Sequence, residues 1–407
     1  MSTTSPLTRP SLPEYRRAEL PPYRKKRAAA HKALQVLDLP SDKKYTNWER
    51  LQLAGKFEGK DIGGVDPVFS IDQADYETGI KTIAIPLAKA VKDWPEHVTP
   101  YLQKALPETF HYYSALSAAY YRTGAVVVVP PDTEAHIVAD YSLEAGKLNA
   151  YRTIVVVGAG ARATFTEKTS GALLASETLL AHGVEVYVNA NAKFDYYALQ
   201  QWPAGVTSFS AYRALLERDS AMDWLIGSFG ASLSHLHVES GLNGEGAESN
   251  VRAVYYGNND QHFDQQLVAS HLVGHTTSDT YARGIVDDTA RAVYRGMIQI
   301  HPGAHGSSAD QNGHAMLLKN TARVDSIPGL EIDADDVTAG HGATIGEVDE
   351  EQLFYLMARG IAEHEARDLI IHGFFEDLFK RVSRKEVREQ FWSAVRAKQQ
   401  ERLGAHS

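Results

Sequence analysis

Histidine is the residue of this chain with the widest chemical use, because a neutral imidazole binds zinc, iron and copper. The sequence holds 17 histidines. Three groups stand out by their spacing: His235 and His237; His271 and His275; and His301, His305 and His314. A four-residue gap brings two rings together only on a helix, and these segments have the pattern of strands and turns. The spacings therefore favour turn and strand histidines over a metal site.

Other chemical signals are weak. Asp287 and Asp288 are adjacent, so on a strand they point to opposite faces and do not form an acid/base pair. Gly158-Ala159-Gly160 lacks the lysine or the full glycine pattern of a nucleotide site, and no ordered catalytic motif is present. Cysteine is absent, which excludes disulfides, thiolate catalysis and cysteine-ligated clusters held by this chain alone. We expect a chain that does not catalyse a reaction itself.

Charge and hydropathy give a second set of expectations. The formal net charge is −10, yet the first 60 residues carry 13 Lys/Arg against 6 Asp/Glu. The basic cluster at residues 24–27 runs into Ala28-Ala29-Ala30, which indicates the solvated face of a helix rather than a nucleic-acid site. No apolar run reaches about 18 residues and the N-terminus has no apolar core of a signal peptide. The sequence predicts a cytoplasmic protein with no membrane or nucleic-acid partner.

Short strands and turns dominate the middle of the chain. Apolar and β-branched runs such as residues 125–129 and 153–157 end at Pro or Gly. Between Leu233 and Ile345 alternating strands are joined by Asn, Gly, Asp and His turns, without a helical pattern. Many short strands in so long a stretch favour coils stacked along an axis, with a sandwich or jelly roll as the structural rival.

Helical patterns flank this β region. We expect helices at residues 23–37 and 91–106, and further helices after Glu347, where apolar residues recur at spacings of three and four. The predicted organisation is an N-terminal arm and helical region at 1–111, a β-helix core at 112–346 and a C-terminal helical domain at 347–407. The last region carries the apolar stripe Phe374, Phe375, Leu378 and Phe379. Such a stripe is most often core, and a docking face is the second interpretation.

Several ordered motifs resemble the SufB/SufD family of iron-sulfur cluster assembly proteins. The resemblance covers most of residues 230–382, with a fainter echo at Leu39-Pro40 and residues 44–47. It rests on Val251–Tyr255, Ser278–Gly284, Arg295–Ile300, Ala309–Asn312, Ile332–Val337, Gly340–Gly346, Glu365–Arg367 and Gly373–Phe375. SufB relatives carry cysteines and this chain has none, so it resembles SufD more than SufB.

The resemblance implies a mainly β fold, a right-handed parallel β-helix flanked by N-terminal and C-terminal helical regions. It also implies a non-catalytic scaffold subunit of the SUF system. Such a chain is expected to pair with SufB through the end of the β-helix and to bind the SufC ATPase through its C-terminal helices, at Phe374, Phe375, Leu378 and Phe379. A homodimer of the isolated chain is a further arrangement, and the sequence does not decide between it and the heterodimer. No cofactor is expected to be bound tightly, and a transient iron-sulfur cluster is expected at the SufB interface.

By the same resemblance, His341 matches the family's interface histidine. It is the candidate ligand of iron or of a nascent cluster, and imidazole can replace thiolate at iron. The flanking Gly340 and Gly342 would let a partner backbone approach closely. Some relatives have cysteine two residues before this histidine, where this chain has Ala339, so no thiol is available there. The alternative role of His341 is packing in a turn at the end of a strand.

Two other classes of protein are compatible with stacked coils. A β-helical carbohydrate-active enzyme needs two carboxylates that converge in one groove, and the sequence shows no such spaced pair. A purely structural solenoid would organise partners without contacting iron. Reconstituted cluster assembly separates the scaffold from both alternatives.

Overall fold

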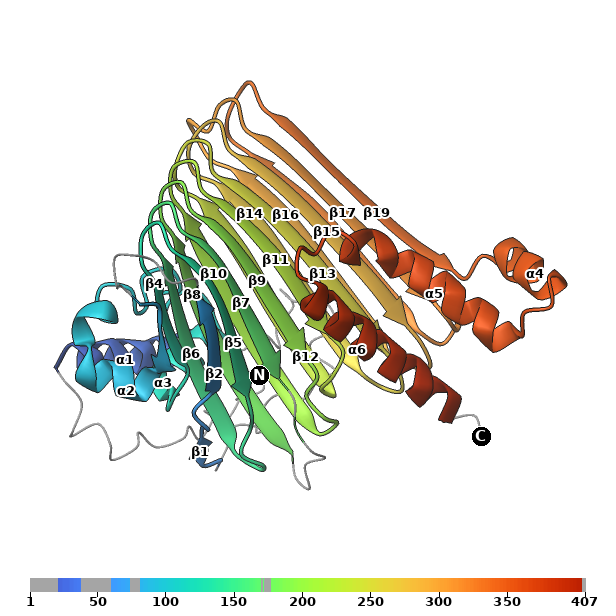
Figure 1. Ribbon diagram of the computed structural model, residues 1–407, viewed down its shortest axis with the longest axis horizontal. Helices are drawn as coiled ribbons and strands as arrows, with labels where there is room; N and C mark the ends of the chain where they lie inside the picture. Colours follow the sequence, from blue (N-terminus) through green and yellow to red (C-terminus); the bar gives the residue numbers. More distant parts are fainter. Residues whose placement is uncertain (1–20, 38–59, 74–80, 170, 172–176, 405–407) are drawn as a thin grey trace, which may run out of the picture.

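The computed structural model describes residues 21–37, 60–73, 81–169, 171 and 177–404. The expected arm before residue 21 and the polar segment at residues 44–47 lie outside these ranges. Within them, two long sheets stack side by side and wind along one axis (Figure 1).

Each turn of the chain adds one strand to each sheet. Among the described residues, sheet A has ten strands, β1(Ile62–Gly63), β3(Ile83–Pro86), β4(Ala125–Val129), β6(Leu148–Val157), β8(Thr178–Val188), β10(Val206–Leu216), β12(Leu233–Leu242), β14(His262–His271), β16(Arg291–Ile300) and β18(Arg323–Ile332). Sheet B has nine, β2(Val68–Gln73), β5(Glu134–Tyr141), β7(Arg162–Thr169), β9(Lys193–Gln200), β11(Ala221–Ser228), β13(Glu248–Gly257), β15(Thr277–Val286), β17(Ser308–Leu317) and β19(Thr338–Glu347).

The core strands pair in parallel from one coil to the next, so the fold is a β-solenoid of about 7 turns. The predicted mainly β solenoid with helices at both ends is confirmed, and the sandwich alternative is wrong. The turns explain how the coils stack without a strict sequence repeat. Asn191 (φ 60) and Asp219 (φ 54) adopt the left-handed conformation, and each N–H donates to a carbonyl of the next coil, Arg218 O at 3.0 Å and Glu245 O at 2.9 Å.

Alternate residues of each strand fill the space between the sheets, which is called the bore here. Aromatic rings occupy its middle coils. The ring centroids of Tyr196 and Trp224 lie 4.9 Å apart, and Tyr212 stacks on Trp224 at 6.2 Å. The bore is therefore a packed core rather than an open channel along its length.

Helices cover the outer faces of both sheets. At the N-terminal end, α1(Pro21–Ala33), α2(Leu87–Asp93) and α3(Tyr112–Tyr120) lie beside sheet A (Figure 1). At the other end, α5(Glu363–Phe379) and α6(Lys385–Gly404) cross sheet B, while α4(Glu350–Ala358) projects from the body. None of the described helices is long and apolar enough to cross a membrane.

The expected helix at residues 91–106 is much shorter. It ends at Asp93 and is followed by a 3₁₀ turn, η3(Pro95–His97). Trp94 precedes Pro95 and has φ −139° and ψ 58°, because the proline ring disfavours helical geometry in the residue before it. Turns rather than a helix therefore lead into residues 98–107.

Candidate functional site

The two ends of the solenoid differ. At the N-terminal end, β2 and β3 pair antiparallel with β5 and β4 and close the stack. At the C-terminal end, β18 and β19 are the last strands of their sheets among the described residues. Each is ten residues long, and between them they expose Ile327, Leu330, Ile332 and Ile345. Long edges with exposed apolar side chains are surfaces on which another strand pairs.

His341 lies on the edge strand β19. In the sheet register it is the partner of Gln311, which in turn pairs with Thr280. Gln311 is 1% exposed and Thr280 is 3% exposed, because their strand positions face the bore. Since neighbours in register point to the same face, His341 stands at the mouth of the bore, and it is exposed there.

The glycines beside His341 lie against side chains of the neighbouring strand β17. A Cβ on Gly342 would lie 2.6 Å from Oδ1 of Asn312, and one on Gly340 would lie 3.0 Å from Oδ1 of Asp310. A side chain at position 342 would therefore displace Asn312. The two glycines also leave β19 without side chains on the outer face on either side of the histidine.

The C-terminal stripe is largely buried, which agrees with its first interpretation as core. Phe375, Leu378 and Phe379 are at most 3% exposed and belong to one apolar cluster with sheet B residues such as Leu225 and Val254. Phe374 is half-buried, with the guanidinium of Arg283 at 5.5 Å from its ring centroid. α5 uses the three buried side chains to pack on its own solenoid, and a docking role of the stripe stays a prediction.

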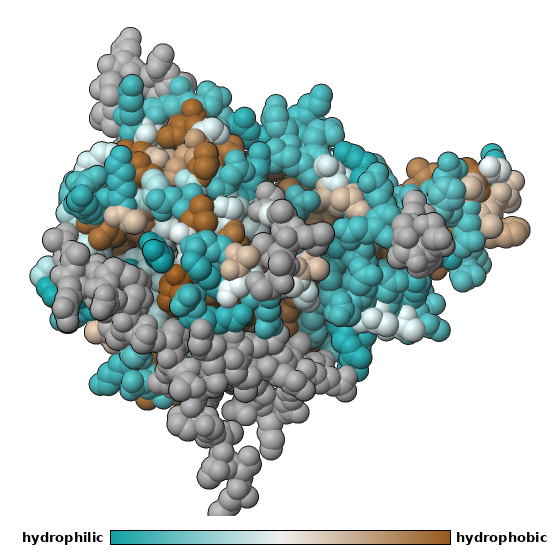
Figure 2. All heavy atoms as spheres, turned by 90° about the horizontal axis from the view of Figure 1, so that it is seen from below, coloured by the Kyte–Doolittle hydropathy of each residue, from teal (hydrophilic) through white to brown (hydrophobic). Residues whose placement is uncertain are grey.

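The exposed apolar residues of the C-terminal region lie earlier in the chain. Phe354, Tyr355 and Met357 on α4 are 73%, 57% and 42% exposed, and Leu369 on α5 is 52% exposed. These four residues are called the α4 surface. Figure 2 shows brown and tan atoms on the lobe at the right, which α4 forms. The helical stripe is visible in the sequence, but helical spacing alone does not tell which side of the helix packs on the solenoid.

His235 and His237 share a strand face, as predicted, but they are buried at 4% and 5% exposure. His111, at the N-terminus of α3, covers them with its ring centroid 6.5 Å and 5.5 Å away. His235 Nδ1 lies 3.5 Å from Asp264, and His237 Nε2 lies 3.5 Å from Glu239. Burial lowers the pKa of His111 well below its usual value, so its ring is neutral. The cluster joins the N-terminal helices to sheet A.

The other histidines hold turns and coils together. His271 is buried and its ring nitrogens contact Thr276 and Ser278, both at 2.8 Å, while burial lowers its pKa to about 4. His301 Nε2 contacts Ser270 at 3.0 Å and His305 Nδ1 contacts the Asp335 carbonyl at 2.8 Å. Within the described ranges no three His, Asp or Glu residues are arranged to hold a metal ion. His271, His301 and His305 therefore make structural contacts in turns and between coils.

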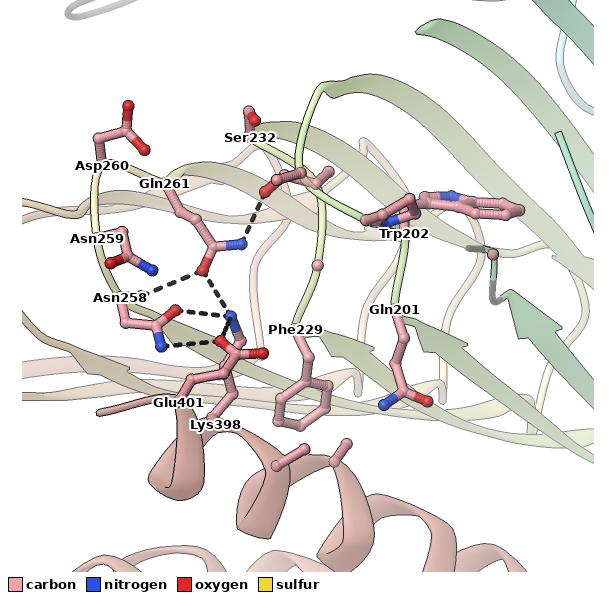
Figure 3. A pocket seen from close by; sticks show the side chains of 17 residues that line it. Gln201, Trp202, Phe229, Ser232, Asn258, Asn259, Asp260, Gln261, Lys398 and Glu401 are labelled. Atoms are coloured by element: carbon pink, nitrogen blue, oxygen red, sulfur yellow. Dashed lines mark hydrogen bonds and ion pairs between the residues drawn. The ribbon is translucent and has the colours of Figure 1, made fainter. Parts of the chain in front are cut away.

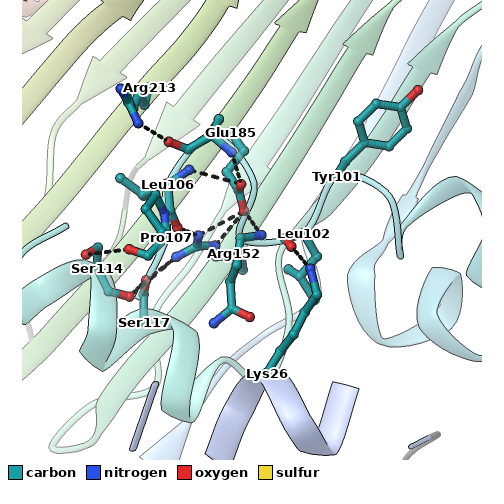
Figure 4. A network of polar contacts seen from close by, with 12 residues as sticks. Lys26, Tyr101, Leu102, Leu106, Pro107, Ser114, Ser117, Arg152, Glu185 and Arg213 are labelled. Atoms are coloured by element: carbon teal, nitrogen blue, oxygen red, sulfur yellow. Dashed lines mark hydrogen bonds and ion pairs between the residues drawn. The ribbon is translucent and has the colours of Figure 1, made fainter. Parts of the chain in front are cut away.

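A fully buried ion pair was missed from the sequence. Arg152 on β6 and Glu185 on β8 are both inaccessible to solvent, and Nη2 and Oε1 are 2.9 Å apart. Glu185 also accepts hydrogen bonds from the backbone N–H groups of Gln103, Ala105 and Leu106 at 2.7, 3.0 and 3.2 Å (Figure 4). Arg152 in turn donates to the Ser117 hydroxyl at 3.1 Å. The pair fixes the turns at residues 103–106 on the outer face of sheet A.

A cavity of about 570 Å³ lies between α6 and the solenoid turns at residues 201–204, 229–232 and 258–261 (Figure 3). Lys398 is 6% exposed at its edge. Its Nζ donates to Asn258 Oδ1, Gln261 Oε1 and Glu401 Oε2 at 2.7, 2.8 and 3.1 Å. All three protons of the ammonium group are used, so Lys398 ties α6 to the solenoid.

Comparison with known families identifies the class of protein that this fold defines. Residues 139–374 match the model described as "SUF system FeS cluster assembly, SufBD core domain". The chain therefore belongs to the SufBD family of the SUF system. The matched region contains the solenoid from β6 to β19, the α4 surface and His341.

Individual relatives agree with this assignment. A SufBD family protein of Mycobacterium leprae is 32% identical over 231 residues, which are 57% of this chain and 27% of the relative. One from Mycobacterium tuberculosis is 34% identical over 51% of this chain and 24% of the relative. SufB of Bacillus subtilis is 27% identical over 72% of this chain and 64% of its own length. The chain thus spans only about a quarter of the mycobacterial relatives, and similarity to SufB leaves the SufB and SufD branches unseparated.

Proposed function

We propose that this chain is a non-catalytic, SufD-like scaffold subunit that assembles iron-sulfur clusters together with SufB and the SufC ATPase. The observation that carries the proposal is His341 at the mouth of the bore, on β19, the last strand of its sheet among the described residues of a SufBD-family solenoid. The absence of cysteine favours the SufD branch. It also means that sulfur must be held by a partner, while this chain supplies nitrogen and oxygen ligands.

The partner at the solenoid end is SufB in this proposal. A second family member ends in the same kind of coil, so its last strands can continue the hydrogen-bond ladder of β18 and β19 and cover their exposed isoleucines. A cluster or iron ion at that junction would lie within reach of the His341 imidazole. The cluster is cargo of the complex and leaves it, which agrees with the expectation of no tightly bound cofactor.

The partner at the C-terminal helices is SufC. The stripe from Phe374 to Phe379 is largely buried, so the α4 surface is the docking site in this proposal. Phe354 is its most exposed apolar side chain. This position lies on a projecting helix that the solenoid does not cover (Figure 1). A motion driven by ATP in the partner would act on the solenoid through α5 and α6, which are packed on sheet B.

The test is His341→Ala in a complex reconstituted with SufB and SufC. We expect the complex to form normally and the rate of cluster formation to fall at least about 10-fold, as for loss of a group that supports a metal site. His305→Ala is the matched control, since His305 is exposed on a nearby turn outside the bore, and it should keep the full rate. A normal rate with His341→Ala would remove the ligand role.

A further inference from the structure

Two ionisable residues face each other deep inside the bore, away from the solenoid end. Glu167 on β7 is 1% exposed and His182 on β8 is 3% exposed. The imidazole Nδ1 lies 3.5 Å from the carboxylate Oε1. Buried carboxyl groups usually have a fixed cationic partner, and Glu167 has a histidine instead.

Hydroxyl groups from neighbouring strands complete the cluster. Tyr196 on β9 donates to Glu167 Oε2 at 2.5 Å, and Tyr212 on β10 donates to Oε1 at 2.9 Å. On the other side, His182 Nε2 contacts the Thr153 hydroxyl at 3.0 Å, which contacts Tyr141 of β5 at 2.7 Å. A chain of polar contacts therefore joins Tyr141 to Tyr196 and Tyr212, and its longest link is the 3.5 Å contact between the imidazole and the carboxylate.

Among these buried groups, the Glu167 carboxyl is the one whose pKa lies near neutral pH. Burial raises the pKa of Glu167 to about 7, against the two tyrosine hydrogen bonds, which lower it. Burial lowers the pKa of His182 to about 3, and the positive charge of Arg152 on β6 acts in the same direction. Burial also raises the tyrosine pKa values well above their usual range. At neutral pH the histidine and the tyrosines are thus uncharged.

A small cavity adjoins this cluster. It encloses about 20 Å³, which is room for one water molecule. Besides apolar groups, the lining contains Glu167, Thr169, His182, Gln200, Ser210, Tyr212, Ser228 and Ser234. A water needs two to four polar partners to occupy such a space, and this wall offers that number.

Trp202 separates the cavity from the large outer pocket. Its side chain is 3% exposed and lines both the 20 Å³ cavity and the 570 Å³ cavity beside Lys398. Figure 3 shows the indole pointing away from Lys398. The turn that carries Trp202 follows β9, whose Tyr196 contacts Glu167.

We propose that the bore holds one ordered water molecule hydrogen-bonded to Glu167. The Trp202 indole lies between this water site and the outer pocket, and water and protons pass between the two cavities beside the indole. When Glu167 ionises, its proton passes to water and leaves through that route, and the bound water solvates the carboxylate that remains. This inference does not depend on the role of the chain in cluster assembly.

The experiment titrates the carboxyl group directly. Infrared difference spectra of the full chain between about pH 5 and pH 9 report the C=O band of a buried protonated carboxylic acid. Wild type should lose one such band near the pKa of Glu167, and Glu167→Gln should lack it. Trp202→Ala should admit solvent to the Glu167 carboxyl and so reduce its desolvation. The midpoint of the Glu167 titration should then fall by about one pH unit or more. Gln201→Ala is the control, because Gln201 lines the outer pocket and not the 20 Å³ cavity, and it should leave the midpoint unchanged.

Two further measurements test the proposal if Trp202→Ala does not fold. Trp202→Phe keeps an aromatic ring and should shift the midpoint in the same direction by a smaller amount. A high-resolution crystal structure of the wild type should show one water within hydrogen-bond distance of the Glu167 carboxyl. A cavity without density, or a midpoint that does not move when Trp202 is replaced, would overturn the proposal.

Discussion

At the residue scale, Arg152 and Glu185 show what single charged residues do inside strands that are otherwise apolar. Arg152 directly precedes the β-branched run Thr153–Val157, and Glu185 interrupts the apolar run Val184–Val188. A charge at each of these positions is the signal in the sequence that could have indicated the pair. An unpaired charge in such a strand is costly, so two of them in neighbouring strands indicate an ion pair. Which strands are neighbours is a property of the coil register, and the sequence has no strict repeat from which to count it.

Glu185→Gln tests how much the Arg152–Glu185 pair contributes to stability. The variant keeps the shape of the side chain but leaves Arg152 as an uncompensated buried charge, so the free energy of unfolding should fall by about 3–5 kcal/mol. Urea denaturation followed by circular dichroism measures this change. The surface pair Lys147 and Glu144, both about one third exposed, supplies the control, and Glu144→Gln should cost less than about 1 kcal/mol. Equal effects of the two substitutions would contradict the account.

His341 shows a different limit at the same scale. Its type and its glycine neighbours were visible in the sequence, but only the family resemblance singled it out among 17 histidines. Its position at the bore mouth follows from the register with Gln311 and Thr280. Alternation along β19 predicts that His341 and its second neighbours share a face, but not which face lies inside.

At the scale of elements, strands and terminal helices were predicted well, because alternation and three-four spacing are local properties. The helix expected at residues 91–106 ends at Asp93, before Pro95. The prediction gave more weight to the spacing of apolar residues than to this proline. The side on which α5 packs was not predictable. Apolar residues lie around much of that helix, and the solenoid covers Phe375 and Phe379 while it leaves Leu369 exposed.

Phe354→Asp tests the α4 surface as the docking site for the SufC ATPase. The side chain is 73% exposed, so the change should leave the melting temperature within about 2 °C and weaken partner binding at least about 10-fold. Isothermal titration calorimetry with the purified ATPase measures the affinity. Val36→Asp is the control, since Val36 is 77% exposed at the opposite end of the molecule. Unchanged binding with Phe354→Asp would place the docking site elsewhere.

At the scale of the whole molecule, the fold class followed from the sequence, since stacked coils need many short strands and polar turns. The number of coils, the closed N-terminal end and the open C-terminal end did not follow, because each depends on strand pairing between distant segments. The two ends of the solenoid therefore differ in what they offer to a partner. One end is closed by antiparallel strands and helices, and the other presents β18, β19 and His341.

The most direct test of the central claim is a cryo-electron microscopy structure of the chain in complex with SufB and SufC. We expect strands of SufB to continue both sheets from β18 and β19, with His341 enclosed at the junction and the ATPase on the α4 surface. A complex in which β18 and β19 remain uncovered and His341 faces solvent would contradict it.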